Sequence, residues 1–269
     1  MGGSGILWLR GAIVSILVYI VIAYCMYALS SLQPLAKLIR VLFHDCVVRG
    51  CDGCLDLDHV DNNGLVEISQ ELNAIYDDQF NSSGMSRGDF YALAAVVAIR
   101  MGSEGQTCAQ LHLPAGCTVP VPEMSIRYGR KDCATSPNSP SDSGFPDPHG
   151  DLEHVMEVFR DGMGMTERQV VAIIGAHTMG RASPQNSGFQ GPWAPHANRF
   201  HNGFYHTLVA NASGWHQSRL NFSDAPEELN PRFQWDTGNV NRQPGGGPLP
   251  EDARMMLNTD MVSIWQICI

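Results

Sequence analysis

Apolar side chains recur at helical spacing along most of the chain, and almost no segment alternates apolar and polar residues. A stripe with a period of about 3.6 residues lets a helix bury one face, whereas strict alternation is typical of a half-buried strand. The pattern therefore predicts a mainly α domain whose helices are joined by long loops. Helices are expected over residues 32–46, 65–76, 91–101, 151–160, 167–180 and 200–210.

Several of these helices carry start signals. Pro34 is compatible with the first turn of the first helix, where a missing N–H leaves no bond unmade. Ser86 resembles a cap for the helix near residue 91, and Thr166 with Gln169 forms a capping box. Loops rich in Gly, Pro, Asp or Asn are expected over residues 45–64, 102–148 and 238–252.

Residues 11–30 form an uncharged, apolar run that Arg10 precedes. The run is long enough to cross a bilayer, and a cation on its N-terminal side would place the remaining chain outside the cytoplasm. A cleaved signal peptide and a buried core helix are the alternatives. We expect residues 1–30 to be a membrane anchor or signal peptide, and residues 31–269 to form one extracellular or exoplasmic domain.

Eight cysteines and three Asn-x-Ser sequons favour the same setting. The sequons begin at Asn81, Asn211 and Asn221, and disulfides and glycosylation are both typical of oxidising, extracellular compartments. The formal net charge of −10 argues against a nucleic-acid-binding protein, which would need clustered Lys and Arg.

Arg40 precedes His44 by four residues, so a helix would set the guanidinium and the imidazole on one face. Cleaving a peroxide bond needs a base that moves a proton and a cation that stabilises the departing oxygen, and these side chains suit those tasks. Phe43 would wall the cavity, and Asn62 would orient the imidazole. A structural His–Asp pair and a turn role for Asn62 are the alternatives.

His177 follows an apolar run and is expected on the buried side of its helix. Two histidines facing one cavity are what a haem iron needs if one is to bind it and the other is to act on the open side. A hydrogen-bonded core histidine is the alternative for His177, and a core aromatic is the alternative for Trp193.

The segment around His44 also resembles a known family. Its residues are Arg40-x-x-Phe43-His44-Asp45-Cys46-Val47-Val48-x-Gly50-Cys51-Asp52-Gly53. This run resembles the distal signature of the plant, fungal and bacterial haem peroxidase superfamily, with the cysteine pattern of its secreted members. The resemblance implies that His44 is the acid–base catalyst, that Arg40 assists O–O cleavage and that Asn62 orients His44. It also implies a disulfide between Cys46 and Cys51.

The second half of the chain is similar to cytochrome c peroxidase and ascorbate peroxidase. The similar stretches are residues 165–177, 186–193 and 255–260, with residues 128–132 and 145–148 resembling the loop at the haem edge. The similarity implies that His177 ligates the iron of haem b and that Asp260 accepts the ring N–H of His177. It also implies that Trp193 lies beside that ring.

The same resemblance implies a calcium site on the distal side, since carboxylate and carbonyl oxygens are the ligands that calcium prefers. The matching positions are Asp45, Val48, Gly50, Asp52 and Cys54. Cys54 stands where the family usually has a serine. A second, proximal cation site keeps only Thr178, and His201 replaces its usual aspartate, so a cation there is disfavoured.

The chain also departs from the family. Asn186 stands where ascorbate peroxidases carry the arginine of their ascorbate site, which argues against ascorbate as the reductant. The N-terminal run does not resemble the family's first helix, and the chain stops nine residues after Asp260, so a truncated chain is expected. We expect a haem peroxidase that reduces hydrogen peroxide with one-electron oxidation of a small donor. A non-catalytic, membrane-tethered relative and a calcium-dependent adhesion module are the alternatives.

Overall fold

Two compact units make up the described part of the chain. The computed structural model describes residues 34–111, 113–119, 121–139, 144–210, 214–237 and 249–262. Unit 1 contains the described residues of 34–55, 65–104 and 121–139, and unit 2 contains those of 56–64, 105–119 and 144–262. The expected anchor or signal segment, residues 1–30, lies outside the described residues, so the proposed domain boundary stays a prediction.

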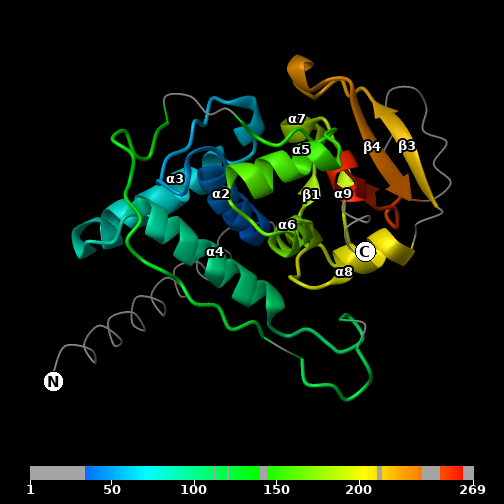
Figure 1. Cartoon of the computed structure of the whole chain (residues 1–269), viewed down its shortest axis with the longest axis horizontal. Coiled ribbons are helices and arrows are strands. Elements are labelled where there is room, and N and C mark those ends of the chain that lie inside the picture. The colour runs from blue at the N-terminus through cyan, green and yellow to red at the C-terminus, as the bar shows by residue number, and fades with distance from the viewer. Residues whose placement is uncertain are drawn as a thin grey trace. The chain divides into compact units, whose positions relative to one another are not determined.

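Three α-helices form the described part of unit 1, in which α2 packs against α3 and α4 (Figure 1). The helices are α2 (Pro34–Arg49), α3 (Val66–Ile75) and α4 (Arg87–Ser103), and a π-turn η2 (Tyr76–Phe80) and a 3-10 turn η3 (Asn81–Ser83) continue α3. The predicted loop after residue 45 begins later, because Gly50 still donates a helical hydrogen bond to the Cys46 carbonyl (3.1 Å). Gly50 then ends the helix with φ +96°.

α4 is buried on nearly all sides. Ser86 caps it by accepting a hydrogen bond from the Asp89 N–H, which confirms the start signal in the sequence. Small alanine side chains on several faces let neighbouring segments approach closely. The buried apolar residues of these three helices include Leu35, Leu38, Val41, Ile68, Leu72, Phe90, Tyr91 and Leu93.

The segment 127–139 is fastened to the N-terminal end of α4. Asp132 accepts hydrogen bonds from the N–H groups of Arg87 (2.8 Å) and Gly88 (2.9 Å), where the helix dipole favours a negative charge. Asp89 accepts hydrogen bonds from the Gly129 N–H (2.7 Å) and the Arg130 guanidinium (2.9 Å). These contacts hold an otherwise irregular segment in place.

Disulfides tie three loops within the described residues. The pairs are Cys46–Cys51, Cys54–Cys133 and Cys108–Cys117. The first is the pair that the resemblance implied. The second joins the loop after α2 to the segment 127–139, and no sequence signal had indicated it.

Unit 2 carries short helices and turns. They are η1 (Val60–Asn62), α5 (Leu152–Met156), η4 (Glu157–Gly162), α6 (Glu167–Ile174), η5 (Gly175–Thr178), α7 (Pro184–Ser187), α8 (Gly203–Ala210), η6 (Glu227–Leu229) and α9 (Asn258–Val262). The capping box of Thr166 and Gln169 opens α6 as predicted. The helix predicted over 167–180 is α-helical only as far as Ile174, and then tightens into the 3-10 turn η5 that carries His177.

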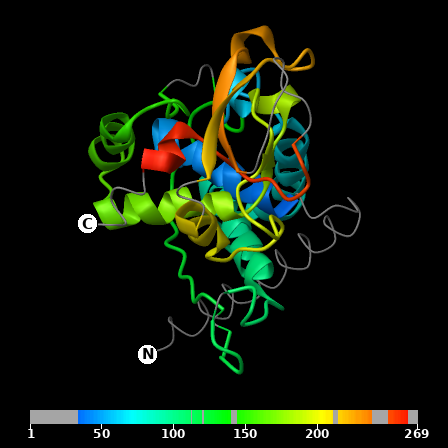
Figure 2. The same cartoon turned by 90° about the vertical axis from the view of Figure 1, so that its right-hand side faces the viewer.

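Unit 2 also contains strands that the pattern of apolar residues did not predict. They are β1 (Arg181–Ala182), β2 (Gly191–Pro192), β3 (Trp215–Leu220), β4 (Arg232–Thr237) and β5 (Met255–Met256). β1 pairs with β2, and β3, β4 and β5 form an antiparallel sheet in that order, seen with α9 in Figure 2. The longer strands do not alternate cleanly in burial, so their sequences lack the period of two that would have indicated them.

Candidate active site

His177 and Asp260 lie at the centre of the site in unit 2. The Nδ1 atom of His177 lies 2.8 Å from Oδ1 of Asp260, whose side chain is fully buried. The Trp193 Nε1–H and the Leu257 N–H both donate to Oδ2 of the same carboxylate, each at 2.8 Å. An ionised carboxylate accepts only, so the ring proton of His177 lies on Nδ1 and the Nε2 lone pair is left for a ligand. The geometry confirms the expected contact between His177 and Asp260.

Trp193 lies parallel to the His177 ring. The ring centroids are 4.4 Å apart with 14° between the planes, and Phe204 meets the same imidazole edge-on at 6.2 Å. Two independent interactions, stacking on His177 and the hydrogen bond to Asp260, therefore hold the Trp193 indole in one orientation. Trp193 lies beside the His177 ring, as the resemblance implied.

Tyr205 of α8 contacts the C-terminal end of α6. Its hydroxyl donates to the carbonyl of Val171, which also accepts the helical hydrogen bond of the Gly175 N–H. Gly175 lies against the same phenol, and a Cβ at that position would overlap it. Sequence reasoning missed Tyr205, because the contact joins residues 34 positions apart and no motif marks it.

His201 links three segments next to the 3-10 turn η5. Its Nδ1 accepts a hydrogen bond from the Gly203 N–H (2.7 Å) and lies 3.0 Å from the Thr178 hydroxyl. Its Nε2 therefore carries the ring proton and donates to the Pro195 carbonyl at 2.9 Å. The imidazole thus uses both nitrogens at the position where the resemblance implies an aspartate.

Arg40 and His44 meet on α2 in unit 1. The Nε–H of Arg40 donates to Nε2 of His44 at 3.2 Å, as four-residue spacing on one helix allows. Phe43 packs edge-on against the His44 ring at 5.6 Å, and His44 is only 8% exposed. Because Nε2 accepts, the neutral imidazole carries its proton on Nδ1.

Asn62, the residue expected to orient His44, belongs to unit 2. It is fully buried in η1, and its Nδ2 donates to the carbonyl of Asp56 at 2.6 Å. The hydrogen bond to Asp56 holds the buried Asn62 amide in place, which a simple turn residue would not need. The role of Asn62 in orienting His44 stays a prediction.

Two carboxylates, Asp45 in the last turns of α2 and Asp52 in the loop that follows, each keep one oxygen without a hydrogen-bond partner. Oδ1 of Asp45 accepts from the Cys54 N–H at 3.1 Å, while Oδ2 is buried without a hydrogen-bond partner, as is Oδ1 of Asp52. Burial, together with the weaker effect of the Asp52 charge, raises the pKa of Asp45 to about 7. Oxygen atoms of this kind fit a hard cation. Cys54 drops out of the expected ligand set because its sulfur is bonded to Cys133.

Comparison with known proteins decides the family. A family model described as peroxidase matches residues 26–266 of the chain. The chain belongs to the haem peroxidase superfamily. A mitochondrial cytochrome c peroxidase of Yarrowia lipolytica is 31% identical over 208 residues, which is 76% of this chain and 47% of the relative.

Two other relatives extend the comparison. A mitochondrial cytochrome c peroxidase of Candida albicans is 35% identical over 49% of this chain and 30% of its own length. A cytosolic L-ascorbate peroxidase 1 of Oryza sativa is 29% identical over 58% of this chain and 53% of its own length. The chain thus spans about half, or less, of the curated relatives it matches.

These relatives correct one expectation. They are named as mitochondrial or cytosolic proteins, so the expectation of an extracellular or exoplasmic domain is wrong. Among the described residues, none of the helices has both the length and the apolar character needed to cross a bilayer. The apolar run 11–30 lies outside those residues, and the expected membrane tether gains no support.

Proposed function

We propose that the protein is a haem-dependent peroxidase that reduces hydrogen peroxide and oxidises a small donor by one-electron steps. The observation that carries the proposal is the buried Asp260 carboxylate, which accepts from both His177 Nδ1 and Trp193 Nε1. A core histidine would not need a buried anion to fix its tautomer. A metal-binding histidine commonly has one, because the anion orients the ring and makes its other nitrogen more basic.

The residues of this site fit haem b. His177 Nε2 would hold the iron, and the Asp260 carboxylate would increase electron donation from the imidazole. When bound, the haem supplies the redox-active iron at which peroxide is reduced. The His177 side chain is 38% exposed, so its free nitrogen is not shut inside the protein core.

His44 and Arg40 are proposed to handle the peroxide proton and charge. His44 Nε2 takes the proton from one peroxide oxygen and delivers it to the other, and the Arg40 guanidinium stabilises the departing oxygen. The Arg40 Nε–H already donates to the His44 Nε2 lone pair, which is the lone pair that must accept the peroxide proton. Peroxide therefore has to displace this bond when it binds, and Asn62 would hold Nδ1–H during the exchange.

The proposed donor is a small aromatic molecule rather than ascorbate. Asn186 offers no positive charge, and its amide packs on Gly64, where an added Cβ would lie 2.5 Å from Nδ2. We propose that Trp193, which stacks on His177, passes an electron from a donor toward the haem. The reductants in the relatives' names are not assumed for this chain. Comparing a phenol with ascorbate tests the proposal, because a phenol needs no dedicated anion site and ascorbate does.

We also propose one calcium ion where α2 ends and the following loop begins. The carboxylates of Asp45 and Asp52 would bind it, together with the main-chain carbonyls of Val48 and Gly50. The support is the pair of buried carboxylate oxygens without hydrogen-bond partners. A divalent cation would offset the two like charges that burial otherwise makes costly.

Reconstitution with haem tests the peroxidase proposal. The wild-type protein should bind one equivalent of haem, show a Soret band and oxidise a phenol in the presence of hydrogen peroxide. His44→Leu should keep the Soret band but lose about 10²- to 10⁴-fold in turnover, the usual contribution of a general base. His177→Ala should lose stoichiometric haem, whereas the exposed His216→Ala should behave like the wild type. A stoichiometric haem complex without turnover would reject the proposal.

A further inference from the structure

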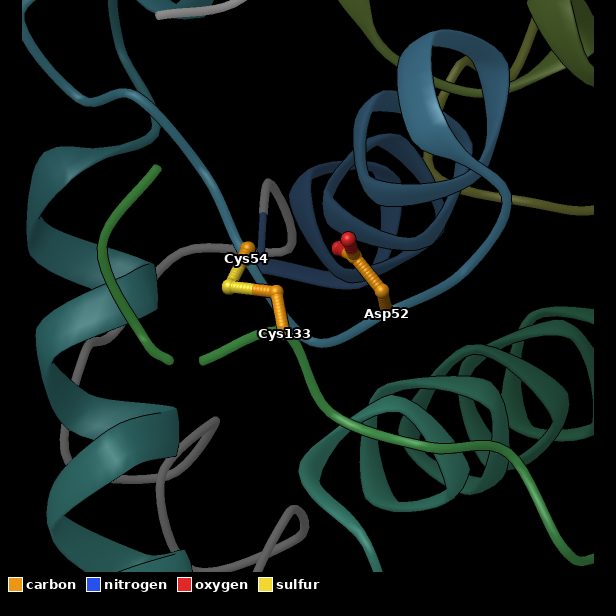
Figure 3. A group of neighbouring side chains, drawn as sticks. All are labelled: Asp52, Cys54 and Cys133. Carbon is orange, nitrogen blue, oxygen red and sulfur yellow. A yellow bond between two sulfur atoms is a disulfide. The ribbon is translucent and has the colours of Figure 1, made fainter. Parts of the chain in front are cut away.

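Asp52, Cys54 and Cys133 form a cluster that shares one carboxylate, Asp52, with the proposed calcium site and adds two sulfur atoms. One carboxylate oxygen and the two sulfur atoms all lie within 4.8 Å of one another. Figure 3 shows that the two cysteines come from separate segments of the chain, with the Asp52 carboxylate beside them. Cys54 is 3% exposed, while Asp52 and Cys133 are half-buried, so small solutes can reach one side of the cluster.

The oxidised cluster leaves one polar atom unsatisfied. Oδ1 of Asp52 is buried and has no hydrogen-bond partner, which costs free energy unless something binds it. The two sulfur atoms carry no charge while they are bonded to each other. Reduction would turn them into thiols that lose their protons to a metal, giving two soft ligands and one carboxylate.

The backbone spacing suits a metal between the reduced sulfurs. Two Zn–S bonds of about 2.3 Å at a tetrahedral angle hold their sulfurs about 3.8 Å apart. The Cα atoms of Cys54 and Cys133 are 6.3 Å apart, so side-chain rotation alone can open the sulfurs to that distance. A water molecule would complete the four ligands.

We propose that Asp52, Cys54 and Cys133 form a redox-controlled site for zinc or a similar thiophilic divalent cation. The site is closed while the disulfide exists and opens when the pair is reduced. In a reducing compartment the dithiol, metal-binding form prevails, because thiols are kept reduced there. Among the described residues, the other two disulfides have no carboxylate grouped with them in this way.

Hydrogen peroxide would release the metal. One thiolate attacks a peroxide oxygen, the O–O bond breaks, and a sulfenic acid and a hydroxide form. The second thiolate then attacks the sulfur of the sulfenic acid, the S–O bond breaks to release a second hydroxide, and the S–S bond closes. The two sulfurs together lose two electrons, the peroxide gains them, two protons convert the hydroxides to water, and the cation leaves with its water.

Zinc binding to the full chain without haem tests the site, so its failure is separate from failure of the peroxidase proposal. The protein is reduced with a phosphine, desalted without oxygen and titrated with Zn²⁺ against a coloured chelator. The wild type should bind one more equivalent than Cys54→Ser/Cys133→Ser, and hydrogen peroxide should release that equivalent. Asp52→Asn should bind it at least about 10-fold more weakly, as loss of a ligand group predicts.

Cys108→Ser/Cys117→Ser is the matched control, since it removes a disulfide that has no grouped carboxylate, and it should keep the extra equivalent. A second measurement needs no variant. Zn²⁺ should slow alkylation of Cys54 and Cys133 in the reduced wild type, but not of Cys108 and Cys117. Equal zinc binding by the wild type and Cys54→Ser/Cys133→Ser, or equal alkylation of the two pairs with zinc present, would overturn the proposal.

Discussion

Asp260 is a fully buried carboxylate whose two oxygens serve different donors. Oδ1 faces His177 Nδ1, and Oδ2 accepts from Trp193 Nε1 and the Leu257 N–H. A buried charge is tolerated only when hydrogen bonds satisfy it, so the donors stabilise the carboxylate while the carboxylate orients the donors. Removing the charge without changing the shape would separate these two effects.

Asp260→Asn is the variant that does so. The amide must turn one N–H toward either His177 or Trp193, which are donors themselves, so one of the two bonds is lost. With haem bound, the imidazole should donate less electron density, the reduction potential of the iron should rise, and turnover should fall by about 10- to 100-fold. A spectroelectrochemical titration and steady-state rates with a phenol measure the two effects.

Trp193→Phe is the matched control for this variant. Phenylalanine keeps an aromatic ring beside His177 but removes the indole N–H, while the bond between His177 and Asp260 is retained. Its reduction potential should stay near the wild-type value, and its loss of turnover should depend on the donor. Equal potentials in Asp260→Asn and the wild type would show that the carboxylate does not tune the site.

At the scale of elements, the change from α6 to η5 sets the position of His177. α6 stops at Ile174, and the chain tightens over Gly175–Thr178. The Tyr205 hydroxyl of α8 donates to the Val171 carbonyl beside the helical bond from the Gly175 N–H, and its ring fills the space beside Gly175. A contact between α8 and the end of α6 therefore supports the turn that carries His177.

Gly175→Ala should disturb this contact. The new methyl group would overlap the Tyr205 phenol, and overpacking of this kind costs about 1–3 kcal/mol in the free energy of unfolding. Urea denaturation of Gly175→Ala, Tyr205→Ala and the double variant forms a double-mutant cycle. In the Tyr205→Ala background the alanine should cost much less, and strictly additive free energies would contradict the steric explanation.

The attachment of segment 127–139 to α4 should depend on pH. Burial of Asp89 favours its neutral form, but hydrogen bonds from the Gly129 N–H and the Arg130 guanidinium outweigh it and lower the Asp89 pKa. A lowered folded-state pKa contributes stability above the unfolded-state value of 3.8 and loses it as the pH falls through the folded value.

Asp89→Asn should therefore destabilise the protein at neutral pH by about 1–3 kcal/mol, and the difference from the wild type should shrink in acid. Thermal unfolding of the wild type and Asp89→Asn from neutral to acid pH measures this difference in stability. The control is Asp161→Asn, whose ion pair with Arg160 is exposed and should matter far less. A difference for Asp89→Asn that does not change with pH would show that the charge of this side chain is not what holds the segment.

Across the whole molecule, local signals predicted more than long-range contacts did. Ser86 and Thr166 marked helix starts correctly, because capping depends on residues three positions apart. The contact between Arg40 and His44 followed from helical spacing in the same way. β3 and β4 were missed, since their burial does not alternate and pairing partners cannot be read from one strand.

Contacts between distant segments needed either a family resemblance or the structure. His177 and Asp260 are 83 residues apart, and the resemblance alone joined them. No resemblance covered Cys133, which meets Cys54 across 79 residues, so this disulfide could not be predicted. Chain path, rather than residue type, brings such groups together.

Calcium should stabilise the whole chain through its proposed ligands at the end of α2 and in the loop that follows. Without the ion, burial raises the pKa of Asp45 from 3.8 to about 7, so burying this group costs nothing in acid, where it is protonated, and on the order of 4 kcal/mol in alkali, where it is ionised. In a chelator, Asp45→Asn should therefore raise the melting temperature at about pH 8, and the gain should fade toward about pH 4. In calcium the order should reverse, because the amide is the poorer ligand. Thermal unfolding in both buffers checks this, and a wild-type melting temperature that calcium leaves unchanged would remove the ion from the proposed site.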